Sequence, residues 1–384
     1  MNVELVYCEG WDPDAHAIVR PLPEADARER DRDGEQYAIM LTGERPLVLI
    51  EVCWAAHYAA VWYFDELGRR DRRLVFRRWP NDRLVLLSAQ RWAYEPGNLE
   101  FHRGEPGWRA PYWRATYEPD GSRQVSSGNW TGPGLEVSTV HLVPDFGRWA
   151  PIIEDVGEVV PRADPQPAAP PDEVPWLPPV PYRPRQLDET FEKGARFELD
   201  DGGLVTVDLT FGGQLWLPSG RLIVADPDPW MHEVAPFIEP VAPGEYPLQL
   251  SVARFADAPE HARVAACALW VSDQPTSSWN NAWREGEHPL LLGDGDFFGV
   301  GVDSGRVALV DAAAAEEFGT TVEGAYEEMS GWSHELAGES ANLITVESGW
   351  GDGSYPVWVG RDDGGELTCF VVDFLVLAHA QPVG

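Results

Sequence analysis

The chain has 384 residues, which is longer than one typical domain, so we expect two. Apolar residues make up 44% of it, enough for packed cores and against general disorder. The formal net charge is −34: residues 1–160 carry 26 acidic and 18 basic side chains, and residues 161–384 carry 37 and 11. Such charge repels phosphate backbones, so nucleic acid is excluded as an expected partner.

The first 160 residues have the pattern of a β-rich domain. Apolar, β-branched and aromatic runs separated by turn residues are typical of strands. The expected strands are 37–42, 46–54, 60–64, 74–76, 83–87 and 112–117. One stretch, 23–33, has a helical composition, but it is polar all round, so both a helix and a loop remain open.

A proline-rich stretch follows at 161–184, where ten of 24 residues are proline. This composition favours an extended polyproline II spacer over a helix or a strand. Trp176 and Tyr182 within it are suited to docking on a neighbouring surface, so the spacer need not be free. We therefore divide the chain into residues 1–160, a linker at 161–184, and residues 185–384.

The C-terminal part is also predicted to be mainly β, in a sandwich-like or open-barrel-like domain with a few short helices. The expected strands are 204–210, 221–225, 246–253, 264–271, 297–302, 307–310 and 366–377. A helix is expected at 311–318, with Asp311 as its N-cap, and a second one at 321–330.

The segment 349–373 predicts a β-hairpin with a glycine-rich lead-in. Gly351 and Gly353 should have positive φ or allow close backbone packing. Because side chains alternate along a strand, Tyr355, Val357 and Val359 should share one face and Trp358 the other. By the same rule, Phe370, Val372 and Phe374 should share a face.

Asp373 is the anomaly of that segment, a carboxylate within an apolar run. Burial without a partner would cost several kcal/mol. We expect it to accept hydrogen bonds from backbone amides, arginine or tryptophan, or to lie at a wet sheet edge.

Four separated blocks of the C-terminal half carry a family resemblance. They are PSGRLIVADP at 218–227, PGEYPLQLS at 243–251, VDSG at 302–305, and GDGSYP at 351–356 followed by VDF at 372–374. In order and spacing they resemble the bacterial domain-of-unknown-function 4241 family, over about residues 205–378. The resemblance implies a bacterial, β-rich domain, and it implies no established activity, catalytic residue or cofactor.

Carboxylates in glycine- and proline-containing turns are one set of candidate functional residues. Together with a histidine they suit a hard cation or acid–base chemistry. Ordinary turn formation is the favoured explanation, because aspartate and glycine are the residues that tight turns need. The candidates are Asp226, Asp228, Asp294, Asp296, Asp303 and His232.

A candidate binding loop lies at 274–283, where Trp279 and Trp283 flank Asn280 and Asn281. Tryptophans beside amides are typical of surfaces that hold sugars or protein partners. The alternative is that these tryptophans fold back and close one end of the sandwich.

The four cysteines, Cys8, Cys53, Cys267 and Cys369, are far apart and lack metal-ligand spacing. We expect them to be reduced, and we expect Cys53, Cys267 and Cys369, which lie in apolar runs, to be buried. We expect no metal and no cofactor. The chain opens without a basic secretory leader, and its longest apolar run is too short to span a bilayer. These features indicate a cytoplasmic protein without membrane partners. A ratio of 28 arginines to one lysine indicates a GC-rich bacterial genome.

The leading hypothesis is a non-catalytic bacterial interaction protein whose acidic surface binds a basic protein partner. One specific form is an immunity-type protein that covers a basic toxin. A hydrolase or isomerase that uses the aspartate-rich turns and a histidine is the first alternative. A carbohydrate-binding module that uses surface tryptophans is the second. The oligomeric state is not predicted.

Overall fold

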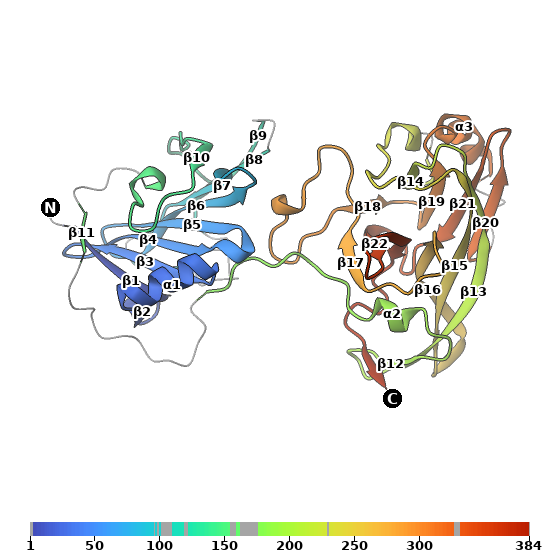
Figure 1. Cartoon of the computed structure of the whole chain (residues 1–384), viewed down its shortest axis with the longest axis horizontal. Coiled ribbons are helices and arrows are strands. Elements are labelled where there is room, and N and C mark those ends of the chain that lie inside the picture. Colours follow the sequence, from blue (N-terminus) through green and yellow to red (C-terminus); the bar gives the residue numbers. More distant parts are fainter. Residues whose placement is uncertain are drawn as a thin grey trace. The chain divides into compact units, whose positions relative to one another are not determined.

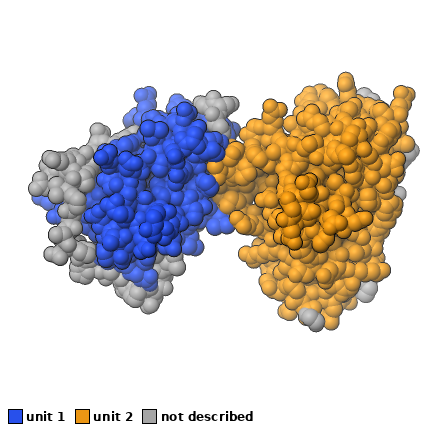
Figure 2. Space-filling view, in the orientation of Figure 1, with its two compact units in different colours: residues 1–180 blue, residues 181–384 orange. Residues whose placement is uncertain are grey.

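The computed structural model describes residues 3–95, 97, 100, 110–118, 122–153, 159–161, 176–228, 230–325 and 331–383. The chain divides into two compact units, residues 1–180 and 181–384, which Figure 2 colours separately. Strands account for 49% of the described residues and helices for 10%, so the predicted mainly-β class is confirmed. No described helix is long and apolar enough to cross a membrane.

Unit 1 is built on one eleven-stranded sheet (Figure 1). Its order is β11-β1-β3-β4-β5-β6-β7-β8-β9, with β2 added to β1 and β10 to β7. Neighbours pair antiparallel, except that β11 runs parallel to β1. The strands are β1 (Val3–Asp12), β2 (Ala17–Pro21), β3 (Tyr37–Thr42), β4 (Pro46–Cys53), β5 (Tyr58–Phe64), β6 (Arg70–Trp79), β7 (Arg83–Trp92), β8 (Tyr112–Tyr117), β9 (Arg123–Gly128), β10 (Val140–Leu142) and β11 (Val159–Pro161).

Alternation along these strands gives the sheet two apolar faces. On β3, Tyr37, Ile39 and Leu41 join one core and Ala38 and Met40 another. The first face is covered by helix α1 (Glu24–Asp33) and by a later segment with 3-10 helix η2 (Ala150–Ile152). The open choice for residues 23–33 is thereby decided in favour of a helix, which ends at Gly34 in the left-handed conformation.

The predicted linker, 161–184, lies largely outside the described residues, because 162–175 are not among them. Its described part is packed at two points. Trp176 is fully buried in unit 1, where its indole N–H donates to the Glu9 carbonyl and its ring lies 5.8 Å from that of Tyr58. In unit 2 the Tyr182 amide donates to the Asp296 carbonyl. Trp176 and Tyr182 thus pack against the chain, as their composition suggested, and the polyproline II spacer itself stays a prediction.

Unit 2 contains a nine-stranded and a four-stranded sheet. The large sheet has the order β17-β22-β23-β16-β15-β13-β12-β24, with β18 added to β22, and the small sheet is β14-β19-β21-β20. The strands are β12 (Arg196–Glu198), β13 (Leu204–Leu217), β14 (Leu222–Ala225), β15 (Gly244–Phe255), β16 (Ala258–Trp270), β17 (Ser278–Asn281), β18 (Gly299–Val302), β19 (Arg306–Asp311), β20 (Ser333–Ala337), β21 (Asn342–Glu347), β22 (Gly353–Arg361), β23 (Leu367–Asp373) and β24 (Gln381–Val383).

The main core of unit 2 lies between the two sheets, so this unit is a sandwich. Helix α3 (Ala315–Ala325) covers the other face of the small sheet with Phe318 and Val322. The outer face of the large sheet carries a smaller cluster around Leu187 of helix α2 (Leu187–Thr190) and Trp358. This thinner cover leaves part of the outer face accessible.

The helix predicted at 311–318 begins later than expected. Asp311 ends β19, and its buried carboxylate accepts hydrogen bonds from the Ser219 amide and hydroxyl and from the Ala313 amide. It therefore stabilises a turn rather than capping the helix. The second predicted helix is not separate, because α3 continues through Ala325, and residues 326–330 lie outside the described residues.

The hairpin predicted at 349–373 is present as β22 and β23. Tyr355, Val357, Val359, Phe370, Val372 and Phe374 face the inter-sheet core, whereas Trp358, Cys369 and Val371 face outward into the smaller cluster. Gly351 has a φ of 102°, and a Cβ on Gly353 would lie 3.2 Å from the Tyr355 ring. Both predictions for this segment are confirmed.

Candidate functional site

The main candidate site is a hollow on the outer face of the large sheet of unit 2, with a volume of about 720 Å³. Strands β13, β15 and β16 form its floor, helix α2 forms one wall, and the loop after β16 together with β17 forms the other. We call it the aromatic groove. It is lined by Leu187, Asp188, Phe191, Leu209, Thr210, Phe211, Pro247, Leu248, Gln249, Trp270, Ser272, Asp273, Gln274, Pro275, Thr276 and Trp279.

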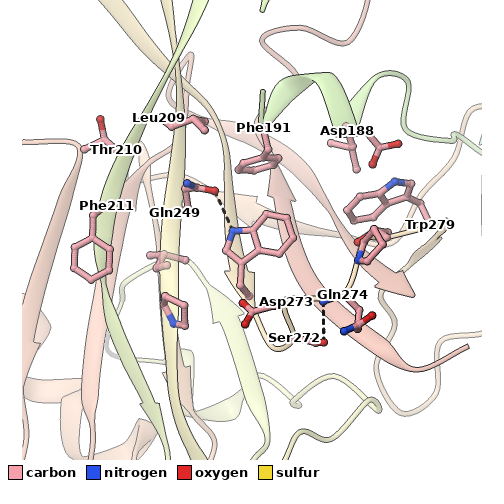
Figure 3. Close-up of a pocket in the computed structure, with 16 residues that line it drawn as sticks. Asp188, Phe191, Leu209, Thr210, Phe211, Gln249, Ser272, Asp273, Gln274 and Trp279 are labelled. Atoms are coloured by element: carbon pink, nitrogen blue, oxygen red, sulfur yellow. Dashed lines mark hydrogen bonds between the residues drawn. The ribbon is translucent and has the colours of Figure 1, made fainter. Parts of the chain in front are cut away.

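Four aromatic rings lie in the aromatic groove (Figure 3). Figure 3 places Phe211 and Trp279 on opposite sides, with Gln249 and Phe191 between them. Trp270 contacts both of these middle residues. The Phe191 ring meets the Trp270 ring edge-on at a centroid distance of 5.8 Å. Phe211 is 66% exposed, so its ring contributes little to any core and is available to a ligand.

The polar groups of the aromatic groove fix the two indoles. The Trp270 N–H donates to Gln249 Oε1 at 3.1 Å. Burial raises the pKa of Asp188, and a hydrogen bond from Trp279 acts against that rise. Because both indole N–H groups have acceptors within the chain, what remains for a ligand is the apolar and π surface of the rings.

The charged side chains that line the aromatic groove are all acidic. Asp188 and Asp273 line it, and none of the lining residues is lysine, arginine or histidine. Within the described part of the chain neither carboxylate forms a salt bridge. The site is therefore suited to a neutral or cationic ligand and repels an anion.

The wall that carries Asp188 and Phe191 is held in place by the segment before it. The Gln186 side chain donates to the Ala380 carbonyl, and the Gln186 carbonyl accepts from the Thr190 hydroxyl. Leu187 is buried against the outer face of the sheet. The wall is thus positioned by hydrogen bonds and packing at both its ends, which favours a preformed site.

The predicted binding loop, 274–283, contributes in part to this site. Trp279 lines the aromatic groove, as does Gln274. Asn281 has a structural role, because its side chain bonds to the backbone of Phe298 and Val357. Asn280 is exposed, and Trp283 lies outside the lining residues, 5.4 Å from the His288 ring.

Most of the aromatic groove was missed by sequence reasoning. Asp188, Phe191, Phe211 and Trp270 come from three separate segments, and none has a motif around it. Trp270 ends an apolar strand and so resembles a core residue. The one local signal was the pair of tryptophans that flank two asparagines within 274–283.

Two of the predicted carboxylate candidates, Asp226 and Asp228, line another hollow of about 450 Å³ together with Trp230 and Glu233 among others. Here they act as turn acceptors. Asp226 Oδ2 accepts from the amides of Asp303 and Ser304, at 2.6 and 2.9 Å, and Asp228 Oδ1 accepts from the Trp230 amide. These bonds are what asparagine and aspartate commonly supply in turns.

The remaining candidates do not join them in one constellation. His232 lies in the 3-10 helix η3 (Met231–Glu233), exposed and tilted against Trp230 at 6.5 Å. Asp294 and Asp296 follow the 3-10 helix η4 (Pro289–Leu291), where Asp296 accepts from the Gly293 amide. In the part of the chain that the structure describes, no three metal-ligating side chains meet in a group suited to a metal ion.

All four cysteines are buried free thiols. Burial raises the pKa of Cys8 and of Cys267 to about 12, and it also raises the pKa of Cys53 and Cys369. The thiolate is the reactive form, so these groups are poor nucleophiles at neutral pH.

Comparison with known families gives one match. Residues 215–372 match the family described as Protein of unknown function (DUF4241). The resemblance inferred for the C-terminal half is thereby confirmed, and the N-terminal half matches no family. The curated proteins and the solved structures give no match.

The DUF4241 match begins within β13 and ends within β23. Trp270, Trp279 and the loop between them lie inside it, whereas Asp188, Phe191 and Phe211 precede it. The aromatic groove therefore combines residues of the DUF4241 region with a wall supplied by the preceding segment.

Proposed function

We propose that this protein is a non-catalytic interaction protein, and that a segment of a basic protein partner binds in the aromatic groove. The observation that carries the proposal is the combination of four rings and two carboxylates without salt bridges in a preformed groove that has no basic lining residue. Aromatic side chains dominate binding energy at protein interfaces, and the carboxylates select for positive charge.

The charge of unit 2 supports the same partner class. Residues 181–384 carry 34 acidic and 10 basic side chains. A field of this sign accelerates encounter with a basic protein and disfavours acidic competitors. A cytoplasmic bacterial protein of the immunity type, which covers a basic toxin, is the specific form that we propose.

Carbohydrate binding is the second candidate, and a specific observation favours it. Gln249, Gln274 and Thr210 place amide and hydroxyl groups beside the aromatic rings, as sugar recognition requires. The carboxylates Asp188 and Asp273 are better suited to a cation than to a neutral sugar.

Hydrolase or isomerase chemistry at the Asp226–Asp228 hollow has less support. Asp226 and Asp228 use carboxylate oxygens to bind backbone amides, and His232 is not among the residues that line the hollow.

The test compares two surface variants of the full chain with two matched controls. Phe211→Ala and Asp188→Asn alter the aromatic groove at exposed positions. Trp350→Ala and Asp363→Asn remove an exposed ring and an exposed carboxylate elsewhere. A basic partner captured from the native host and then purified should bind wild type and both controls.

We expect each groove variant to weaken that binding by roughly tenfold or more, and the affinity to fall as salt rises. If both groove variants bind the purified partner as wild type does, the aromatic groove is not the site. Turnover of a substrate that is lost on Asp226→Asn but kept in Phe211→Ala would support the enzyme alternative instead.

A further inference from the structure

The geometry of the aromatic groove points to one side chain of the partner. We infer that it takes an arginine, whose guanidinium stacks among Trp270, Trp279 and Phe211 and pairs with Asp188 and Asp273. This inference rests on the proposed function, and it adds which chemical group of the partner the site recognises.

The chain itself shows how such a site is built. The Arg284 guanidinium lies 4.7 Å from the Phe237 ring centroid and donates to the carbonyls of Ala235 and Val224. In unit 1, the Arg69 guanidinium lies 4.9 Å from the Tyr94 ring centroid and pairs with Asp65 at 2.7 Å. Each arginine therefore has an aromatic ring beside it and oxygen acceptors at its edge.

The aromatic groove contains the same components without the arginine. Its rings supply π surfaces, and Asp188 and Asp273 supply oxygen acceptors that no described cation occupies. Figure 3 shows Asp188 beside Trp279, and a hydrogen bond joins the two side chains. Asp273 follows Trp270 by three residues and also lines the groove. A cation placed there would gain both a ring contact and a charged hydrogen bond.

Arginine fits this arrangement better than lysine does. A guanidinium is planar and weakly hydrated, and it presents several donors at its edge, so it can stack and pair at the same time. A lysine ammonium is compact and strongly hydrated, and it loses more on leaving water. The basic residues of this chain are 28 arginines and one lysine, and a partner encoded by the same genome would share that bias.

The volume of about 720 Å³ exceeds what one guanidinium fills. It lies in the range of sites that enclose a small-molecule ligand. The neighbouring residues of the partner would therefore also enter the aromatic groove, and Thr210, Gln249 and Gln274 are placed to bond with their backbone. The occupant that this predicts is an extended, arginine-bearing segment rather than a free amino acid.

The experiment uses the full chain and labelled short peptides of glycine and serine with paired arginines at the centre. Matched peptides carry lysine or citrulline at the same positions, since citrulline keeps the shape of arginine and lacks its charge. Fluorescence anisotropy should show saturable binding of the arginine peptide, roughly tenfold weaker binding of the lysine peptide, and none of the citrulline peptide.

Variants then place that binding in the aromatic groove. Phe211→Ala and Asp188→Asn should each weaken binding of the arginine peptide by roughly tenfold. Trp350→Ala and Asp363→Asn should leave it unchanged.

Equal affinity for the arginine and citrulline peptides would overturn the inference, as would binding that the groove variants leave intact. Direct binding of neutral oligosaccharides that the groove variants abolish, with no arginine-peptide binding, would assign the site to sugars and overturn it too. If groove variants abolish binding of the purified partner while the arginine peptide fails to bind, the inference falls and the proposed function stands.

Discussion

The two units treat their charged side chains differently. In unit 1 many arginines lie over aromatic rings, as seen for Arg28, Arg69, Arg70, Arg72, Arg73, Arg77, Arg78 and Arg91. In unit 2 the large excess is acidic, and the aromatic groove holds rings and carboxylates with no arginine among its lining residues. Unit 2 also has such stacks, at Arg254, Arg263 and Arg284. The rings of the aromatic groove differ from these, because no arginine of the chain lines the groove beside them.

The difference teaches where to look for function in a chain without catalytic motifs. A ring that already carries an arginine of its own chain, such as Trp62 under Arg70 and Arg73, is part of the scaffold. A ring with an adjacent carboxylate and no cation, such as Trp279 beside Asp188, is available to a partner.

The largest expected effect is at the buried ion pair of unit 1. Arg70 pairs with Glu100, and both side chains are buried, at 7% and 3% exposure. Glu100→Gln would leave the Arg70 charge buried without its counterion, which should lower the free energy of unfolding by roughly 3–5 kcal/mol. Chemical denaturation measures the loss, and hydrogen exchange at β5 and β6 assigns it to unit 1.

The control is Glu24→Gln, which breaks the exposed pair with Arg28, at 57% and 60% exposure. That change should stay within about 0.5 kcal/mol. Similar losses of stability for the two variants would show that burial does not make the Arg70–Glu100 pair more important than the exposed pair. The contrast between the units would then fail.

An intermediate effect is expected at Asp373 in unit 2. Its carboxylate accepts from the Trp358 indole and the Leu375 amide, as the sequence led us to expect. Burial raises its pKa from 3.8 to about 6, and the two hydrogen bonds act against the rise. The folded state therefore holds an extra proton between about pH 4 and pH 6.

Unit 2 should accordingly lose stability as pH rises through that window, by roughly 1–3 kcal/mol, and the loss should be complete above the folded pKa. Asp373→Asn should remove this part of the pH dependence, although losing one acceptor costs about 1 kcal/mol at every pH. Thermal and urea unfolding at pH 5 and pH 8 check this. Identical pH profiles for the two proteins would contradict it, and the surface variant Asp363→Asn should keep the wild-type profile.

The smallest expected effect concerns an arginine stack at the surface of unit 1. The Arg28 guanidinium lies 4.3 Å from the Phe146 ring centroid. Arg28→Lys keeps the charge and loses the planar contact, which should lower stability by about 0.5 kcal/mol. Arg148→Lys, at a side chain that is 82% exposed and lies over no aromatic ring among the described residues, should change nothing measurable. If the two substitutions are equivalent in urea titrations, arginine stacking does not stabilise unit 1.

Local pattern was sufficient for many strands. The prediction 37–42 coincides with β3, and the faces of β22 and β23 follow from alternation. The same pattern missed the ends of strands that continue in polar residues. The prediction 74–76 is the middle of β6, which runs Arg70–Trp79, because its arginines lie over rings of β5 and so tolerate half-buried positions.

The sequence by itself determined the mainly-β class, the positions of many strands and the DUF4241 resemblance. It also determined that the Asp373 carboxylate, if buried, must accept hydrogen bonds. These depend on side-chain period and on turn residues, which act over a few neighbouring positions. Tertiary structure alone decided that Asp188, Phe211, Trp270 and Trp279 line one groove. That meeting depends on the order and register in which β13, β15 and β16 pair and on where α2 packs, and such long-range pairing leaves no mark on the residues around each position.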